Sequence, residues 1–147
     1  MKKNNKIRLL IFIVSGFFLF LDQFFKYQAS HGWLNKNMLL NHLGWQPFFN
    51  KGVAFGLSLP NILTIIITLI IVIIIGYIIK KEKNNIKLLA WSLILAGALS
   101  NLFDRLYYGH VVDYFTILTS IMNVADVLIV CGLGIYILTT CRCVSKS

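Results

Sequence analysis

The carboxylates of this chain are few, and most of them stand beside apolar segments. Of 147 residues, 58% are hydrophobic and only five are acidic. Asp104, Asp113 and Asp126 fall within residues 96–127, and Asp22 ends another apolar run. An ionisable group at bilayer depth costs roughly 2.5 to 3.5 kcal/mol on insertion scales. Carboxylates in these positions therefore indicate a functional site.

Two converging aspartates offer general acid–base chemistry. Neighbouring like charges do not both ionise easily, so such a pair shares one proton. The ionised member can take a proton from water, and the protonated member can polarise a scissile carbonyl. Asp113 follows the third apolar segment and Asp126 lies just inside the fourth. If these two segments are neighbours, both carboxylates can meet at one membrane surface.

Other kinds of chemistry lack their residues. The sequence contains no G-x-x-x-x-G-K-[ST] phosphate loop, and His31, His42 and His110 are too dispersed for a metal site. No serine or cysteine stands in a nucleophile motif, and Ser100 is interpreted as a helix-packing residue. We therefore expect neither a metal ion nor another cofactor.

Four apolar segments are long enough to cross a membrane: residues 7–27, 62–79, 86–103 and 124–140. The second has eighteen residues and, at 1.5 Å per residue, spans about 27 Å, close to the hydrocarbon thickness of a bilayer. The sequence predicts an all-α membrane protein with four transmembrane helices, forming a single domain over residues 1–147.

The basic residues predict the orientation of these helices. The net charge is +9, with short basic runs at residues 2–8 and 80–87 and further basic residues after the fourth segment. Short basic loops stay in the cytoplasm, so both termini are expected there and the aspartates near the outer face. Because the charges flank apolar segments, they indicate membrane topology and not nucleic-acid binding.

The segment between the first two spans, residues 28–60, has a different character. Its glycines, prolines and aromatic residues favour short strands and turns at the membrane interface. Within it, residues 50–56 read NKGVAFG, and their small residues allow the backbone to approach another group closely. An ordinary turn is the alternative interpretation of this pattern.

Two helix positions carry further polar groups. Gly97, Asn101 and Asp104 follow helical spacing and share one face with Arg105 if the helix continues. Asn123 and Asp126 have the spacing of an N-cap and its N3 residue, so capping is their alternative, structural role.

Five motifs together resemble the lipoprotein signal peptidases, the signal peptidase II family of bacterial intramembrane aspartyl proteases. They occur in the family's order, at the outer ends of the four predicted spans, and cover nearly the whole chain: Asp22-Gln23-x-x-Lys26, Asn50-x-Gly52-x-Ala54-Phe55-Gly56, Gly97-Ala98-Leu99-x-Asn101-x-x-Asp104-Arg105, Gly109-x-Val111-Val112-Asp113 and Asn123-Val124-Ala125-Asp126.

The resemblance implies a role for each matched residue. Asp113 and Asp126 form the catalytic dyad, and Asp22 and Lys26 support it. The implied substrate-binding residues are Asn50, Gly52, Asn101, Asp104, Arg105 and Asn123. The implied activity is an aspartic endopeptidase of the bacterial cytoplasmic membrane. It removes the signal peptide from diacylglyceryl-modified prolipoproteins by cutting before the lipidated cysteine, and its expected partners are these substrates and membrane lipid, with the protein a monomer.

This sequence departs from the family pattern near its second aspartate. Asp113 and Asp126 are 13 residues apart, a shorter interval than the family's, and Ser120-Ile121-Met122 replaces the usual aromatic and proline residues. Ser100 stands where glycine is common. Two other functions compete with the peptidase: a four-helix transporter or channel with a coupling carboxylate, and a non-catalytic relative that binds lipidated peptides.

Overall fold

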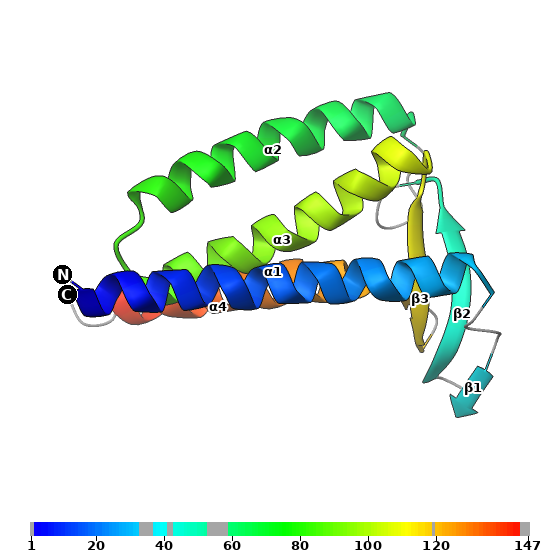
Figure 1. The fold of residues 1–147 in the computed structure, drawn as a ribbon, viewed down its shortest axis with the longest axis horizontal. Helices are drawn as coiled ribbons and strands as arrows, with labels where there is room; N and C mark the ends of the chain where they lie inside the picture. Colours follow the sequence, from blue (N-terminus) through cyan, green and yellow to red (C-terminus); the bar gives the residue numbers. More distant parts are fainter. Residues whose placement is uncertain (1, 33–36, 41–42, 53–58, 119, 145–147) are drawn as a thin grey trace.

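The computed structural model describes residues 2–32, 37–40, 43–52, 59–118 and 120–144. Its four long helices are α1 (Lys2–Ser30), α2 (Asn61–Lys81), α3 (Asn85–Tyr107) and α4 (Val124–Val144). All four are long and apolar enough to cross a membrane. They run side by side, and a sheet closes one end of the bundle (Figure 1). The predicted four-helix membrane architecture is confirmed.

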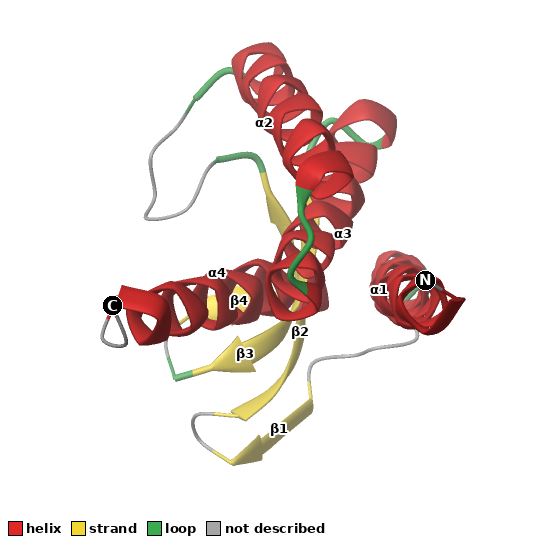
Figure 2. Cartoon of the chain, turned by 90° about the vertical axis from the view of Figure 1, so that its left-hand side faces the viewer, coloured by secondary structure: helices red, strands yellow, loops and turns green. Residues whose placement is uncertain are grey.

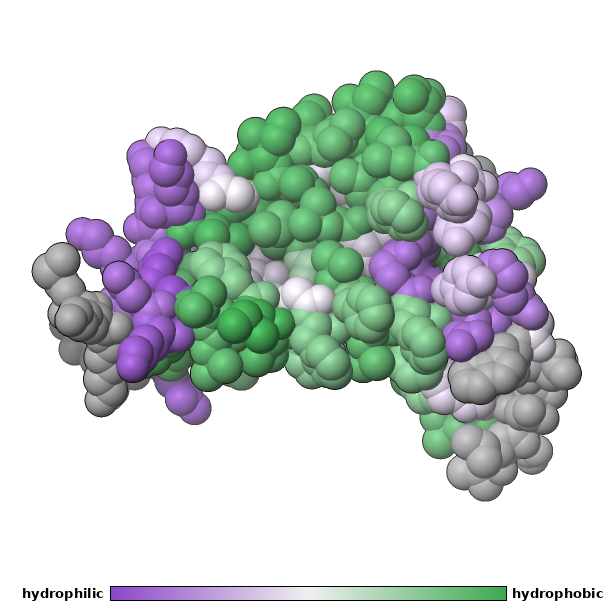
Figure 3. Space-filling model, in the orientation of Figure 1, coloured by the Kyte–Doolittle hydropathy of each residue, from purple (hydrophilic) through white to green (hydrophobic). Residues whose placement is uncertain are grey.

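Helix α3 is the centre of the bundle. It contacts α1, α2 and α4, which surround it in the view along the bundle (Figure 2). In its most apolar stretch 61% of the residues are buried, against 17% in each of the other helices. Their outward faces carry exposed leucine, isoleucine and phenylalanine side chains, which form an apolar band between two polar ends (Figure 3). This band is the surface that a bilayer covers.

The sheet is antiparallel with strand order β1-β2-β3-β4, comprising β1 (Asn37–Leu40), β2 (Leu43–Asn50), β3 (Val111–Ile117) and β4 (Ser120–Met122). The β2–β3 register shifts between Trp45 and Phe48, where Pro47 stands, as expected for a proline that donates no ladder hydrogen bond. Gly109, with φ of +75°, turns the chain from α3 into β3. This turn brings Asp113 back over the end of α3.

The sequence located the four helices but underestimated their lengths, and it did not predict strands β3 and β4. Helix α1 continues three residues past the predicted end at residue 27, and α3 four residues past residue 103. The extra turn of α3 includes Asp104 and Arg105, so both lie on the helix and not in a loop. Strands β1 and β2 lie within segment 28–60, as predicted, whereas residues 53–56 of the NKGVAFG motif lie outside the described residues.

Small residues let α3 and α4 approach each other closely. A Cβ added to Gly97 would clash with the carbonyl oxygen of Ala125 and lie 2.8 Å from Ile129 Cγ1. A Cβ added to Gly132 would lie 2.6 Å from Ile94 Cγ1. Close backbone contact of this kind holds membrane helices together. Asp126 directly follows Ala125, so the contact at Gly97 also fixes the position of Asp126 along α3.

We expect Gly97→Val to separate α3 from α4 and to cost about 1 to 3 kcal/mol of stability, the usual range for overpacking. The measurement is the unfolding midpoint in detergent. Gly134→Ala is the matched control, because a Cβ there meets nothing within 4 Å. An unchanged midpoint for Gly97→Val would show that the helices do not pack as described.

Candidate active site

Asp113 lies in the middle of β3, with 2% of its surface exposed. Each of its carboxylate oxygens accepts one amide hydrogen bond. Asn123 Nδ2 donates to Oδ1 at 2.6 Å, and Asn50 Nδ2, at the end of β2, donates to Oδ2 at 3.1 Å. The Asn50 amide is itself fixed, because its oxygen accepts the Gly52 N–H at 2.9 Å. Two strands and the start of α4 therefore position this carboxylate.

Asp126 lies in the first turn of α4. Its backbone N–H donates to Asn123 Oδ1 at 2.9 Å, which confirms the predicted N-cap and N3 pairing. Its carboxylate accepts a hydrogen bond from Asn101 Nδ2 of α3 at 2.9 Å. Asn123 therefore has two roles at once: it caps α4 through its oxygen and binds Asp113 through its nitrogen.

The two carboxylates belong to one polar group. Asn123 Nδ2 lies 3.3 Å from Asn101 Oδ1, so the asparagine bound to Asp113 also touches the asparagine bound to Asp126. Burial, and after it the negative charge of Asp126, raises the pKa of Asp113 to about 6, against the opposing effect of its amide donors and Lys26. An aspartate in this state holds its proton to higher pH than an ordinary surface aspartate.

Lys26 is a buried cation in contact with this polar group. Its ammonium group lies 2.9 Å from Asp22 Oδ2 and 2.9 Å from Asp104 Oδ2, and donates to Asn101 Oδ1 at 2.8 Å. Lys26 is 1% exposed, and both aspartates are completely buried. Asp22 and Lys26 are one helical turn apart on α1 and form an i,i+4 ion pair.

Asp104 ties α3 to the sheet and to α1. Besides Lys26, its side chain accepts the backbone N–H of Val112 at 3.1 Å and the amide of Gln23 at 2.9 Å. Val112 immediately precedes Asp113, so this bond fixes the strand that carries the carboxylate. The resemblance placed Asp104 among the substrate-binding residues, but its completely buried position groups it with Asp22 and Lys26.

Two residues of this cluster were missed or misread in the sequence. Ser100, interpreted as a packing residue, donates to Asp22 Oδ2 at 2.6 Å and accepts from Gln23 Nε2 at 2.8 Å. Tyr114 donates to Asp22 Oδ1 at 2.9 Å and accepts the Val124 N–H at 3.2 Å, which joins α1, β3 and α4. A tyrosine directly after Asp113 points to the other side of the strand, and that alternation was the available signal.

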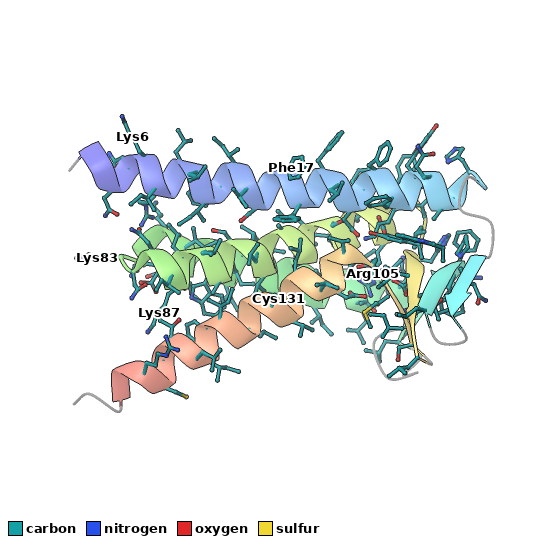
Figure 4. All side chains as sticks on the ribbon, turned by 90° about the horizontal axis from the view of Figure 1, so that it is seen from below. Lys6, Phe17, Lys83, Lys87, Arg105 and Cys131 are labelled. Carbon is teal, nitrogen blue, oxygen red and sulfur yellow. The ribbon has the colours of Figure 1, made fainter. Side chains whose placement is uncertain are left out.

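Arg105 lies at the edge of the site. It is the last basic residue of α3, and its side chain is partly exposed where the helix reaches the sheet (Figure 4). Its positive charge is close enough to act on Asp126, Asp104 and Asp113. The backbone oxygen of Arg105 accepts a hydrogen bond from Asn61 at the start of α2 at 3.1 Å. A partly exposed cation beside two carboxylates suits contact with a substrate.

This chain is similar to known proteins of one family. The signal peptidase (SPase) II family profile matches residues 14–142. A lipoprotein signal peptidase of Pasteurella multocida is 36% identical over 109 residues, which cover 69% of this chain and 58% of that protein. A lipoprotein signal peptidase of Caldanaerobacter subterraneus is 34% identical over 127 residues, covering 82% of this chain and 88% of that protein.

The fold has solved counterparts as well. A bacterial membrane enzyme determined in meso at 2.3 Å resolution superposes with a TM-score of 0.84 at 29% identity, covering 95% of this chain and 90% of that one. A second such enzyme, determined at 1.9 Å, gives a TM-score of 0.77 at 30% identity, covering 90% and 91%. Sequence motifs, family profile and fold thus agree, and the transporter alternative finds no support. This chain belongs to the signal peptidase II family, the membrane peptidases that remove signal peptides from prolipoproteins.

Proposed function

We propose that this protein is an aspartic endopeptidase that cleaves diacylglyceryl-modified prolipoproteins just before the lipidated cysteine, with Asp113 and Asp126 as its catalytic dyad. The observation that carries the proposal is the linked pair of carboxylates, each held by asparagine amides where the bundle meets the sheet. Both side chains are positioned before substrate arrives, as catalysis by placed groups requires.

The dyad can hydrolyse a peptide bond without a covalent intermediate. The ionised aspartate takes a proton from water, and the oxygen of that water attacks the scissile carbonyl carbon. The protonated aspartate gives its proton to the carbonyl oxygen, which forms a neutral tetrahedral intermediate. When the C–N bond breaks, one aspartate gives its proton to the leaving nitrogen, and the other takes a proton from a hydroxyl of the intermediate as the carboxyl product forms, so the two aspartates again share one proton.

The surroundings suggest which aspartate starts protonated. Asp113 has a pKa raised to about 6 by burial and by the charge of Asp126. Asp126 lies in the first turn of α4, where the helix dipole favours an anion by about 0.3 to 1 kcal/mol. We assign Asp126 as the initial base and Asp113 as the initial acid. The pair exchanges roles within the cycle, and its titration belongs to both groups together.

The other predicted site residues fall into groups according to their positions around the dyad. Arg105 is a substrate-contacting cation, and Asn50, Asn101 and Asn123 hold the dyad carboxylates. Gly52 keeps the Asn50 amide turned toward Asp113. We propose that Asp22, Lys26 and Asp104 support the site from inside the bundle. Metal-free catalysis and a monomeric state remain predictions from the sequence.

Lipid is the natural second partner of this site. An apolar groove runs along α1 and α3 within the membrane-spanning band, lined by Leu19, Phe20, Gln23, Leu99, Ser100, Leu102, Phe103 and Leu106. Ser100 on this groove is the neighbour of Asn101 at the dyad, so an acyl chain in the groove lies beside the catalytic helix. Each buried CH₂ contributes about 0.8 kcal/mol, so two acyl chains supply much of the substrate's binding.

We expect the purified enzyme to cleave a diacylglyceryl-modified model prolipoprotein at least about tenfold faster, in kcat/KM, than the same precursor without lipid. The reason is that acyl chains hold the scissile bond at the depth of the dyad. The measurement is cleavage in detergent micelles, with both precursors at equal concentration. Equal rates would contradict the lipid requirement, and no cleavage of either precursor would favour the non-catalytic, lipopeptide-binding alternative.

The charge distribution supports an orientation with both termini in the cytoplasm. The start of α1, the α2–α3 connection and the end of α4 lie at one end of the bundle, opposite the sheet (Figure 1). The basic residues of residues 2–8 and 80–87 lie at that end. We propose that it faces the cytoplasm and that the sheet and dyad lie at the outer surface.

In intact cells, a cysteine-free variant carrying Trp45→Cys should react with a membrane-impermeant maleimide, whereas one carrying Lys83→Cys should react only after lysis. Trp45 is on β2 and Lys83 lies between α2 and α3, at opposite ends of the molecule. The reverse pattern of labelling would invert the topology and place the dyad on the cytoplasmic side.

A further inference from the structure

The three asparagines at the dyad all turn their NH₂ groups toward carboxylates. An asparagine amide can present either its oxygen or its nitrogen to a neighbour, and the two orientations have nearly the same shape. What fixes the orientation is the group on the other side of the amide. For Asn50 that group is the Gly52 N–H, and for Asn123 it is the Asp126 N–H. Each of these can only donate, so the amide oxygen faces it and the NH₂ group faces Asp113.

For Asn101 the orienting group is a side chain. Lys26 Nζ lies 2.8 Å from Asn101 Oδ1, and an ammonium group has three donors and no acceptor. Asn123 Nδ2 is a second donor to the same oxygen, at 3.3 Å. The Asn101 oxygen therefore faces Lys26, and its NH₂ group donates to Asp126 Oδ1 at 2.9 Å.

The position of Lys26 is itself tightly fixed. It also contacts Asp22 Oδ2 and Asp104 Oδ2, both at 2.9 Å, and Ser100 Oγ at 3.3 Å. With 1% of its surface exposed, Lys26 does not reach a substrate in the membrane. Besides the direct effect of its positive charge on the two carboxylates, it acts on the reaction through the residues that it touches.

We propose that Lys26 is a positioning residue for Asp126: by holding the Asn101 oxygen, it keeps the Asn101 NH₂ group directed at the catalytic carboxylate. This inference rests on the proposed aspartyl dyad and adds to it the reason why a buried lysine accompanies the site. Without a donor-only group at position 26, Asn101 can turn its oxygen toward Asp126. An oxygen there accepts a hydrogen bond from the protonated carboxyl group and so favours the neutral form over the anion.

The test compares Lys26→Gln with Lys26→Arg. Glutamine offers both a donor and an acceptor and so permits either orientation of Asn101, whereas arginine offers donors only. Other charges that act on Asp126, namely Asp113 on β3, Arg105 on α3 and Asp22 on α1, are unchanged in both variants. The readout is the pH profile of kcat/KM for a lipidated precursor, together with the separate values of kcat and KM.

For Lys26→Gln we expect the acidic limb of the profile to move up by about one to two pH units, with kcat reduced and KM nearly unchanged. Lys26→Arg should keep the limb near its original position. Asn101→Leu, which removes the donor to Asp126 and keeps both ion pairs of Lys26, should reproduce the shift. Combining Asn101→Leu with Lys26→Gln should move the limb no further, because both changes act through one amide.

Lys26→Gln leaves two buried carboxylates without their cation and can prevent folding. A second variant therefore tests the same inference with a cluster that carries no charge. The triple variant Asp22→Asn, Lys26→Gln, Asp104→Asn contains no buried charge in the cluster and should show the same shifted limb. A folded variant with an unmoved limb, or a loss confined to KM, would overturn the inference while leaving the dyad intact. If neither Lys26→Gln nor the triple variant folds, Lys26 is a structural residue and the inference fails. Full activity of Asp126→Asn would instead overturn the proposed function.

Discussion

Asp113→Asn and Asp126→Asn should each lower the single-turnover rate of precursor cleavage by at least about 10² to 10⁴. Asparagine keeps the shape of aspartate but cannot exchange a proton, and positioned acid–base catalysis is worth about this factor. Each dyad carboxylate already accepts at least one amide hydrogen bond, so the substituted side chains have partners in the folded protein. The measurement is cleavage of a lipidated precursor with enzyme in excess.

Measuring the stability of these two variants shows whether activity is lost through the chemistry or through unfolding. The folded pKa of Asp113, about 6, lies above its ordinary value of 3.8, so its ionisation weakens the fold as pH rises through 6. Asparagine does not ionise, so the Asp113→Asn protein should lack this pH-dependent loss of stability. Near-normal cleavage by either folded variant would exclude the aspartyl dyad.

Reagents that inhibit metal-dependent or thiol-dependent peptidases serve as controls. A chelator and a thiol-alkylating reagent should leave cleavage intact, since the dyad uses neither a metal nor a thiol. Glu82→Gln is the matched carboxylate control, because Glu82 lies in the α2–α3 connection, at the opposite end of the bundle from the sheet. Abolition of activity by chelator alone would contradict the mechanism as firmly as an active dyad variant.

Asp104→Leu should destabilise the protein by about 3 to 5 kcal/mol, because it breaks a buried ion pair and leaves its partners unpaired. Lys26 loses one of its two carboxylates, and the Val112 N–H and the Gln23 amide each lose an acceptor. The expected signature is a lower unfolding midpoint in detergent, with activity falling because β3 loses its anchor beside Asp113.

Asp104→Asn should have a smaller effect, since its amide oxygen can still accept one of these hydrogen bonds. The Asp104 and Asp113 variants should therefore differ in kind. Asp104→Leu lowers stability together with activity, whereas Asp113→Asn lowers activity alone. If Asp104→Leu unfolds at the parent midpoint but is completely inactive, Asp104 takes part in the chemistry and the choice of dyad is wrong.

The sequence by itself determined the membrane architecture and the candidate residues. Long apolar runs predict the spans because the thickness of a bilayer sets their length. The scarcity of carboxylates made each one conspicuous in so apolar a chain. The Asn123–Asp126 spacing also predicted the cap of α4, because an N-cap bond joins residues only three apart. These signals are local, so they can be read along the chain.

Only the tertiary structure decided which polar groups meet. Asp113 reaches Asn50 through the pairing of β2 with β3, which joins segments more than 60 residues apart along the chain. Asp126 reaches Asn101 because Gly97 lets α4 pack closely against α3, and the rotation of one helix against another is a property of the packed pair. The roles of Ser100 and Tyr114 depend on contacts between elements 78 and 92 residues apart along the chain. Separations of that size leave no local pattern, so the buried network around Lys26 emerges only when the helices and the sheet come together.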